Sequence, residues 1–337
     1  MIRVIVTDDS AFMCKLLSDI INSDPELEVV ATARDGKELL EKLEKNKPDL
    51  VTLDISMPVM DGITALKEIM NKNPLPVIMI SSLADEENTF TCLELGAVDF
   101  IPKTSGIISI DMNKKKDIII NKIKAAFSAR LDTTITEQSV GETKPYSGKY
   151  DQILCIGAST GGPKAIESVL QGLPGDFPLP VLIVQHLPEE FTLPFSKRLD
   201  RLCALKVKEA ENHEAIKPGV VYVAPGDFHM EIKKEKVPVI KLTKDLVVLG
   251  VRPSVDVMMK SAAEIYGEKT IGVLLTGMGK DGAEGMKLIK DKNGETIVQD
   301  ETTSIVPGMP RAAIKLGAAT EVVPLSSIAK EVLKRIK

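Results

Sequence analysis

The chain has 337 residues, and this length suggests two domains because a single domain usually contains roughly 100–200 residues. Its 43 Lys and Arg against 48 Asp and Glu give a net charge of −5, which argues against the strongly basic surface of a nucleic-acid-binding protein. No apolar run reaches the roughly 20 residues that a transmembrane helix needs. We therefore expect no transmembrane segment. The four cysteines show neither metal-ligand nor redox spacing, so we expect reduced thiols in a cytoplasmic protein.

The first 130 residues alternate short apolar runs with amphipathic helical patterns. The predicted strands are 2–6, 28–33, 50–53, 77–80 and 98–101. The predicted helices are 11–22, 36–45, 63–71, 86–95 and 115–130. This alternation predicts right-handed crossovers and a parallel sheet with helices on both faces. We therefore expect residues 1–130 to form a doubly wound, flavodoxin-like α/β domain.

The pattern changes after residue 130. Residues 131–150 are rich in Thr, Ser, Gly and charge, and they lack a sustained period, which predicts a linker. The pattern of residues 151–337 predicts a second doubly wound, Rossmann-like domain with an added β-hairpin over 233–249. Its predicted strands are 152–156, 180–184, 220–223, 271–275 and 296–299, and its predicted helices include 163–173 and 326–336.

Polar side chains follow several predicted strands of the first domain. Asp8 and Asp9 come after the first strand and Asp54 after the third, while Ser81 and Lys103 follow the fourth and fifth. Asp and Ser at such positions often only cap the next helix. Carboxyl ends of parallel strands meet at one edge, however, and three carboxylates together favour a bound Mg²⁺. The hydroxyl and the ammonium are suited to bind phosphoryl oxygens.

These residues resemble the response-regulator receiver domain over about residues 1–130. The similarity rests on Asp8-Asp9-Ser10, on the segment Asp-Ile-Ser-Met-Pro-Val-Met-Asp-Gly at 54–62, and on the polar residues after the fourth and fifth strands. The resemblance implies that Asp54 is the phosphoacceptor. It also implies an Mg²⁺ site formed by the carboxylates of Asp9 and Asp54 and the carbonyl of Ser56, with Asp8 assisting.

The same resemblance assigns a switch to this domain. Ser81 and Phe100 match the pair that repacks on phosphorylation, and Lys103 matches the receiver lysine. One departure is visible, because receivers usually continue this lysine with proline, whereas here Lys103 is preceded by Pro102 and followed by Thr104. A cis peptide after Lys103 is therefore not expected, and the shape of this loop departs from the family pattern.

The first strand of the second domain leads into the glycine-rich segment Gly-Ala-Ser-Thr-Gly-Gly-Pro at 157–163. Such a loop before a helix can hold a phosphate on helix N–H groups. It can equally present Ser159 as a nucleophile at the positive helix end. The segment is neither GxGxxG nor a P-loop, so taken alone it leaves both interpretations open.

His186 and Asp281 also follow strands of the second domain. Alone, His186 is more simply explained as a structural histidine, and Asp281 as the N-cap of a helix that begins near Ala283. Together with Ser159, each ends a separate strand of one parallel sheet, so the three can meet at one edge. A serine nucleophile needs an imidazole base, and that base needs a carboxylate to orient it.

Five segments of the second domain resemble the chemotaxis protein-glutamate methylesterase family, CheB, over about residues 151–337. They are 157–162, 185–188, 253–256, 276–283 and 308–311. The resemblance implies Ser159 as nucleophile, His186 as general base and Asp281 as its orienting partner. The Met278 N–H and Thr160 would serve as oxyanion or positioning groups.

The resemblance also implies a function and partners. The substrates would be methylated glutamates on the cytoplasmic helices of chemoreceptors, hydrolysed through an acyl-enzyme to glutamate and methanol, and receptor glutamines would be deamidated as well. The phosphodonor would be the chemotaxis histidine kinase, and the esterase would need no cofactor. Two alternatives remain: an output domain that binds a nucleotide or S-adenosylmethionine, and a DNA-binding output, which would require a helix-turn-helix.

Overall fold

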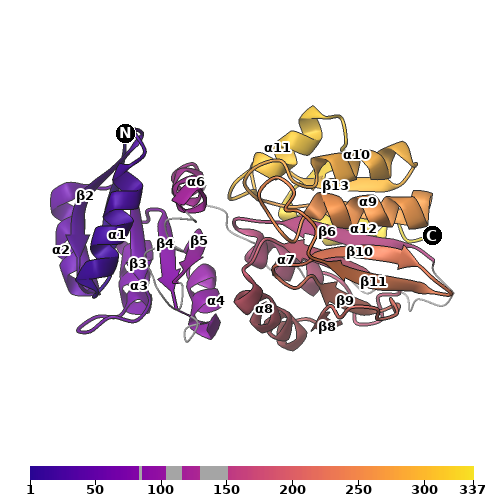
Figure 1. Cartoon of the computed structure of the whole chain (residues 1–337), viewed down its shortest axis with the longest axis horizontal. Helices are drawn as coiled ribbons and strands as arrows, with labels where there is room; N and C mark the ends of the chain where they lie inside the picture. The colour runs from indigo at the N-terminus through magenta and orange to yellow at the C-terminus, as the bar shows by residue number, and fades with distance from the viewer. Residues whose placement is uncertain (83–85, 104–115, 130–150) are drawn as a thin grey trace. The chain divides into compact units, whose positions relative to one another are not determined.

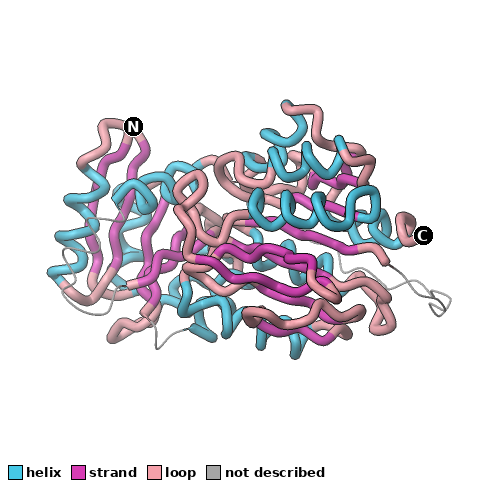
Figure 2. The backbone as a smooth tube through the Cα atoms, turned by 45° about the vertical axis from the view of Figure 1, so that its right-hand side comes forward, coloured by secondary structure: helices cyan, strands magenta, loops and turns pink. Residues whose placement is uncertain are grey.

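The computed structural model describes residues 1–82, 86–103, 116–129 and 151–337. The chain divides into two compact units, Met1–Asp132 and Thr133–Lys337, which are described separately (Figure 1). The predicted linker at 131–150 lies outside the described residues, as does Thr104. Within each unit, helices flank a layer of strands (Figure 2).

The first unit contains a five-stranded parallel sheet with the order β2-β1-β3-β4-β5. Its strands are β1 (Ile2–Thr7), β2 (Leu27–Ala33), β3 (Leu50–Asp54), β4 (Val77–Ser81) and β5 (Asp99–Pro102). Its helices are α1 (Ala11–Asn22), α2 (Gly36–Asn46), α3 (Gly62–Lys72), α4 (Glu86–Glu94) and α6 (Lys116–Phe127). Every residue of β3 and β4 is buried, because helices cover both faces of a doubly wound sheet. The predicted flavodoxin-like fold is confirmed.

The second unit contains a seven-stranded parallel sheet with the order β14-β13-β12-β6-β7-β9-β8. Its strands are β6 (Ile153–Ala158), β7 (Val181–Gln185), β8 (Lys206–Glu209), β9 (Val220–Val223), β12 (Thr270–Leu274), β13 (Glu295–Gln299) and β14 (Glu321–Val323). Its helices are α7 (Gly162–Gln171), α8 (Glu189–Leu202), α9 (Val255–Tyr266), α10 (Ala283–Asp291), α11 (Gly308–Lys315) and α12 (Leu325–Leu333), with a short 3₁₀ helix at Gly267–Lys269. The predicted second parallel α/β domain is confirmed.

An antiparallel hairpin of β10 (His229–Lys234) and β11 (Pro238–Thr243) accompanies this sheet and lies beside α9 (Figure 1). The hairpin was predicted over 233–249, and that range is wrong by four residues at its start and six at its end. The last residues of the predicted range, 244–249, form a loop, with one isolated bridge from Val248 to Val251.

Two strands at the sheet edges, β8 and β14, and the helices α8, α9 and α11 were not predicted. Both strands are short and partly exposed, so their sequences lack the buried apolar run that marks the central strands. Helix α8 contains Pro194, which usually indicates a helix end and hides the helical pattern.

Three strands that are neighbours in the sheet order, β12, β6 and β7, position the candidate site of the second unit. Their registers align Gly157 with both Leu274 and Val184, and the next pair in the β6–β7 register is Ala158 with Gln185. The residues that follow these strands therefore emerge side by side at the carboxyl edge. Buried methionines such as Met258 and Met286 belong to the hydrophobic core of this unit.

Candidate functional sites

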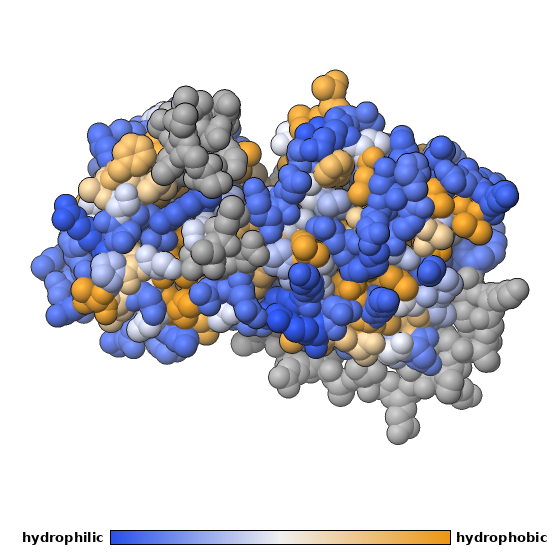
Figure 3. Space-filling view, turned by 60° about the horizontal axis from the view of Figure 1, so that its bottom comes forward, coloured by the Kyte–Doolittle hydropathy of each residue, from blue (hydrophilic) through white to orange (hydrophobic). Residues whose placement is uncertain are grey.

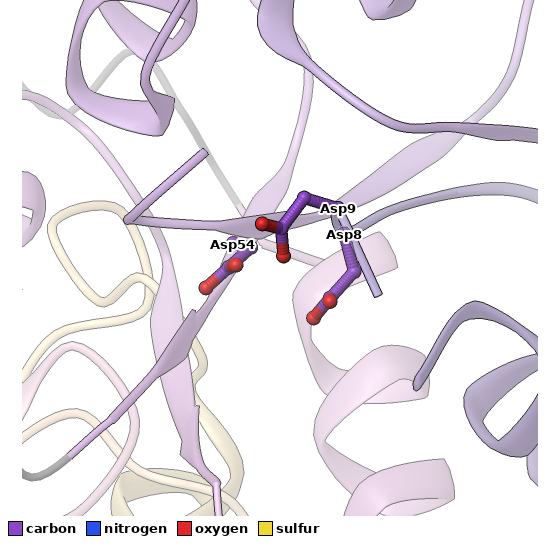
Figure 4. A group of neighbouring side chains, drawn as sticks. All are labelled: Asp8, Asp9 and Asp54. Carbon is purple, nitrogen blue, oxygen red and sulfur yellow. The ribbon is translucent and has the colours of Figure 1, made fainter. Parts of the chain in front are cut away.

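Three carboxylates gather at the carboxyl edge of the first sheet. Asp8 and Asp9 follow β1, and Asp54 ends β3. One carboxylate oxygen from each lies within 4.8 Å of the others (Figure 4). Asp8 and Asp54 are buried, whereas Asp9 is exposed. The predicted acidic cluster is therefore present, and it has the composition typical of a magnesium site.

Lys103 lies just after β5 and partly neutralises this cluster. Its Nζ is 2.9 Å from Asp8 Oδ2 and 2.8 Å from Asp54 Oδ2. Burial nevertheless raises the pKa of Asp54 to about 6, since the ion pair with Lys103 only partly offsets desolvation, and the neighbouring charges of Asp8 and Asp9 add to the increase. The pocket therefore opposes the negative charge on Asp54 in the absence of a cation.

The donor set fits a hard divalent cation. Asp8 Oδ2 is buried and accepts no hydrogen bond of good geometry, although the Lys103 ammonium is close. An acceptor in this state gains from a cation that takes oxygen ligands and keeps part of its water shell. Ser56 lies two residues after Asp54 and lines a shallow depression with Asp61 and Asn88.

The two residues of the expected switch lie on β4 and β5. Ser81 is fully buried, and its Oγ is 2.5 Å from Thr89 Oγ1 on α4. The Phe100 ring is buried as well, with 1% of its surface exposed. Lys122 of α6 donates to the Phe100 carbonyl at 2.9 Å and lies 5.6 Å from the ring centroid. Thr89 and Lys122 were not identified from the sequence.

In the second unit the structure pairs His186 with Asp281. His186 directly follows β7, Asp281 lies in the loop between β12 and α10, and His186 Nε2 is 2.8 Å from Asp281 Oδ2. Asp281 is only 3% exposed. A hydrolase of the Ser-His-Asp type uses such a carboxylate–imidazole pair, because the carboxylate selects the tautomer and the orientation of the ring.

Asp281 accepts three further hydrogen bonds, all from the start of α9. The Ser254 hydroxyl donates to Oδ1 at 2.8 Å, and the backbone N–H groups of Val255 and Asp256 donate at 2.7 and 3.1 Å. Burial opposes the charge of Asp281, but the hydrogen bonds from His186, Ser254 and Val255 outweigh burial and hold its pKa below the ordinary value.

The possible N-cap role of Asp281 for α10 is not what the structure shows. The N-cap of α10 is Gly282, and no side chain caps that helix. The Asp281 carboxylate instead lies at the N-terminus of α9, where the helix dipole favours a negative charge.

Ser159 follows β6, and hydrogen bonds of its backbone N–H and carbonyl hold it in place. Its N–H donates to the Thr276 carbonyl at 3.0 Å, and its own carbonyl accepts from Gly162 N at 2.7 Å and from Gln185 Nε2 at 2.9 Å. A Cβ on Gly162 would lie 2.0 Å from Gln185 Oε1, so any larger residue here would displace the side chain that holds the Ser159 carbonyl. Within the described residues the Ser159 hydroxyl makes no hydrogen bond, and none joins it to His186.

The loop after β12 lies against Ser159. A Cβ on Gly277 would be 2.8 Å from Ser159 Cβ, so the two segments are in close contact. The N–H of the next residue, Met278, has no acceptor in the part of the chain that the structure describes. Thr160 is buried, and its carbonyl accepts from the Thr276 hydroxyl at 3.0 Å. The Met278 N–H therefore remains available as a backbone donor beside Ser159.

Three supporting residues of this site were missed: Ser254, Gln185 and Thr276. All three lie within family-like segments, and Ser254 also precedes an apolar helical pattern, which is the usual signal of an N-cap. That signal identifies the cap but not the contact with Asp281, which lies 27 residues away.

No helix in the described ranges is long and apolar enough to cross a bilayer. The face of the molecule drawn in Figure 3 is largely hydrophilic, with hydrophobic residues in scattered patches.

Fold and sites define a class of protein: a receiver domain followed by an α/β domain with the residues of a serine hydrolase. Comparison with known families agrees. Residues 154–332 match the family model of the CheB methylesterase, and residues 4–111 match that of the response regulator receiver domain. The chain belongs to the CheB methylesterase family. This match is not consistent with the two alternatives, an output domain that binds a nucleotide or S-adenosylmethionine and an output domain that binds DNA.

Individual relatives support the assignment over the full chain. A protein-glutamate methylesterase/protein-glutamine glutaminase from Pyrococcus horikoshii is 49% identical over 100% of this chain and 94% of its own length. A protein of the same name from Halalkalibacterium halodurans is 44% identical, and the aligned region covers 100% of this chain and 99% of the relative. The crystal structure of the Thermotoga maritima CheB methylesterase catalytic domain superposes with a TM-score of 0.54 at 44% identity, and it covers 55% of this chain and 98% of that domain.

Proposed function

We propose that this protein hydrolyses glutamate methyl esters on chemoreceptors with Ser159 as nucleophile, His186 as general base and Asp281 as the partner of the base. The chain is a protein-glutamate methylesterase/protein-glutamine glutaminase with a receiver domain, and chemoreceptor demethylation and deamidation are its reactions. The observation that carries the residue assignment is the bond between His186 and Asp281 at the sheet edge where Ser159 presents a free hydroxyl.

The hydrogen bond to Asp281 supports one ring nitrogen of His186 as the base. Because His186 Nε2 donates to Asp281, Nδ1 is the nitrogen left to take the Ser159 proton. The serine oxygen attacks the ester carbonyl, and the resulting oxyanion is stabilised by the Met278 N–H and by Thr160. Protonated His186 then gives its proton to the leaving methoxide, and methanol departs from the acyl-enzyme.

The second half of the reaction uses the same groups. His186 Nδ1 removes a proton from water, the hydroxide attacks the acyl carbon, and Ser159 leaves with the proton returned by the imidazolium. A glutamine side chain follows the same path with ammonia in place of methanol, so one site performs both reactions. Asp281 remains ionised throughout, because four donors hold its pKa low, and it stabilises the imidazolium in both halves.

For the receiver we propose that Asp54 accepts the phosphoryl group from a chemotaxis histidine kinase. Asp9, Asp54 and the Ser56 carbonyl would hold Mg²⁺, with Asp8 assisting, and the bound ion would neutralise the charge that develops during transfer. Ser81 and Lys103 would bind the phosphoryl oxygens, and Phe100 would repack with Ser81. The support is the cluster of three carboxylates beside the ammonium of Lys103.

The same reasoning assigns domains and location. The receiver comprises residues 1–130, the linker 131–150 and the esterase 151–337, and phosphorylation of the first regulates the third. Since the substrates are cytoplasmic receptor helices, we place the protein in the cytoplasm. The esterase chemistry needs only the side chains named above and no cofactor.

The nucleophile assignment is tested with methylated chemoreceptor membranes and a measurement of methanol release. Ser159→Ala should lose at least about three orders of magnitude in kcat, since removal of a triad serine leaves only the oxyanion donors and binding. Ser168→Ala, at a half-buried serine within α7, is the matched control and should match the wild type. Wild-type methanol release by Ser159→Ala would refute the proposal.

A further inference from the structure

Ser254 joins the catalytic carboxylate to two other segments. It is fully buried at the N-cap of α9, and its hydroxyl donates to Asp281 Oδ1 at 2.8 Å. The same oxygen accepts from Val257 N at 3.4 Å, and the Ser254 N–H donates to His229 Nδ1 at 3.2 Å. One residue thus contacts the carboxylate, its own helix and a histidine of the hairpin.

The hydroxyl of Ser254 controls one specific oxygen of Asp281. Oδ2 accepts from His186 and from Val255 N, whereas Oδ1 accepts from Ser254 and Asp256 N. The donors on Oδ1 therefore determine the rotation of the carboxylate plane and, with it, the direction in which Oδ2 meets the imidazole. The bond from Ser254 is shorter than that from Asp256, 2.8 against 3.1 Å.

His229 fixes Ser254 in turn. The imidazole is 1% exposed, and its two nitrogens have different partners. Nδ1 accepts from the Ser254 N–H, so the ring proton is on Nε2, which donates to the Leu246 carbonyl at 3.1 Å. A neutral histidine in this tautomer satisfies the Ser254 N–H and connects the loop that follows β11 with the start of α9.

We infer that Ser254 is a positioning residue for ester hydrolysis: its hydroxyl orients Asp281 toward His186, and His229 holds the serine in place. This inference rests on the catalytic roles of Ser159, His186 and Asp281 proposed above. It assigns a catalytic consequence to a residue whose sequence position indicates only a helix cap. Because the carboxylate is charged and buried, the loss of one donor weakens its alignment in the transition state more than it weakens binding of the neutral ester.

Two substitutions separate the positioning role from the capping role. Glycine is nearly as good an N-cap as serine, whereas alanine is a poor one. A pure cap therefore predicts that Ser254→Gly retains wild-type kcat. The positioning role predicts that Ser254→Gly and Ser254→Ala lose kcat equally, about ten- to hundredfold, with KM for methylated receptor unchanged, as expected for a hydrogen bond to a charged group.

Conservative variants provide the rescue. Ser254→Thr keeps the hydroxyl and should restore kcat to within about threefold of the wild type. His229→Asn places an amide oxygen near the position of Nδ1 and can still accept from the Ser254 N–H, so it should be faster than His229→Leu, which cannot. Thermal unfolding of each full-length variant identifies any loss that comes from unfolding.

The experiment measures kcat and KM for methanol release by these variants beside Ser159→Ala. Equal loss in the glycine and alanine variants with threonine rescue supports the inference. Wild-type kcat in Ser254→Gly, or a threonine variant as slow as alanine, overturns it while the loss in Ser159→Ala leaves the proposed function intact. If Ser159→Ala is itself fully active, the proposed function fails, and the positioning role fails with it.

Discussion

Two buried aspartates, Asp54 in the receiver and Asp281 in the esterase, differ in the direction in which their surroundings move the pKa. Both lie at the carboxyl edge of a parallel sheet, with 2% and 3% of their surface exposed. Burial raises the pKa of Asp54 to about 6, against the opposing effect of Lys103. Burial also opposes the charge of Asp281, yet hydrogen bonds hold its pKa below the ordinary value of 3.8.

The donors around each carboxylate explain this difference. Asp281 accepts four hydrogen bonds, two of them from backbone N–H groups at a helix N-terminus. Asp54 is paired with one ammonium and shares its pocket with the carboxylates of Asp8 and Asp9. A carboxylate with fixed donors stays charged and can serve as a permanent partner of an imidazole. A carboxylate among like charges gains from binding a cation or from reacting with a phosphoryl group.

The largest expected effect follows from removing the negative charge of Asp281. Asp281→Asn should lower kcat for methanol release by about four orders of magnitude, because an amide neither selects the His186 tautomer nor stabilises the imidazolium. Asp291→Asn, at an exposed aspartate that ends α10, is the control and should be unchanged. A loss smaller than about tenfold in Asp281→Asn would contradict the role given to this carboxylate.

Asp54, the proposed phosphoacceptor, should instead affect regulation. A small phosphodonor with Mg²⁺ should raise methanol release by the full-length protein by about 5- to 150-fold, the range of typical coupling between two sites. Asp54→Asn should abolish this response and leave the basal rate unchanged. Stimulation that persists in Asp54→Asn would show that the phosphoacceptor lies elsewhere.

Much of this arrangement was predictable, because apolar runs followed directly by polar residues mark the ends of central strands. Asp54, Ser159 and His186 were found in that way. The supporting contacts were not predictable, because they join segments that are distant in the sequence: Ser254 meets Asp281 across 27 residues, and Gln185 meets the Ser159 carbonyl across 26. The edge strands escaped prediction because partly exposed strands carry polar residues.

The raised pKa of Asp54 predicts a pH-dependent stability. With Mg²⁺ removed by a chelator, the folded receiver binds this proton more tightly than the unfolded chain, so the free energy of unfolding falls as the pH rises from about 4 through about 6. Asp54→Asn should therefore stabilise the protein at pH 7.5 by about 3 kcal/mol, since the pKa rises from 3.8 to about 6 and one pKa unit corresponds to about 1.4 kcal/mol.

Thermal or urea unfolding of the wild type and Asp54→Asn measures this effect. The difference between the two proteins should shrink below pH 5 and on addition of Mg²⁺, which offsets the repulsion in the wild type. Equal stability at pH 7.5 in the absence of Mg²⁺ would mean that the acidic pocket carries no electrostatic penalty.

The smallest effect concerns the backbone of the two sites. Val59, in the loop after Asp54, has a φ of 65°, a left-handed conformation that a β-branched residue rarely adopts. The left-handed residue beside Asp281 is instead a glycine, Gly282, with a φ of 90°. Val59→Gly should raise the free energy of unfolding by about 1 kcal/mol, because it removes this strain at an exposed position. Destabilisation of the variant in urea would show that the valine side chain contributes more than its conformation costs.

The contrast between the two carboxylates is tested most directly by ¹³C NMR of the aspartate carboxyl groups, with the signals assigned from Asp54→Asn and Asp281→Asn. Without Mg²⁺, the Asp54 signal should titrate with a midpoint near pH 6, and Mg²⁺ should move this midpoint down. Asp281 should stay ionised to below pH 3.8 under both conditions. An Asp281 midpoint equal to or above that of Asp54 would contradict the account of both sites.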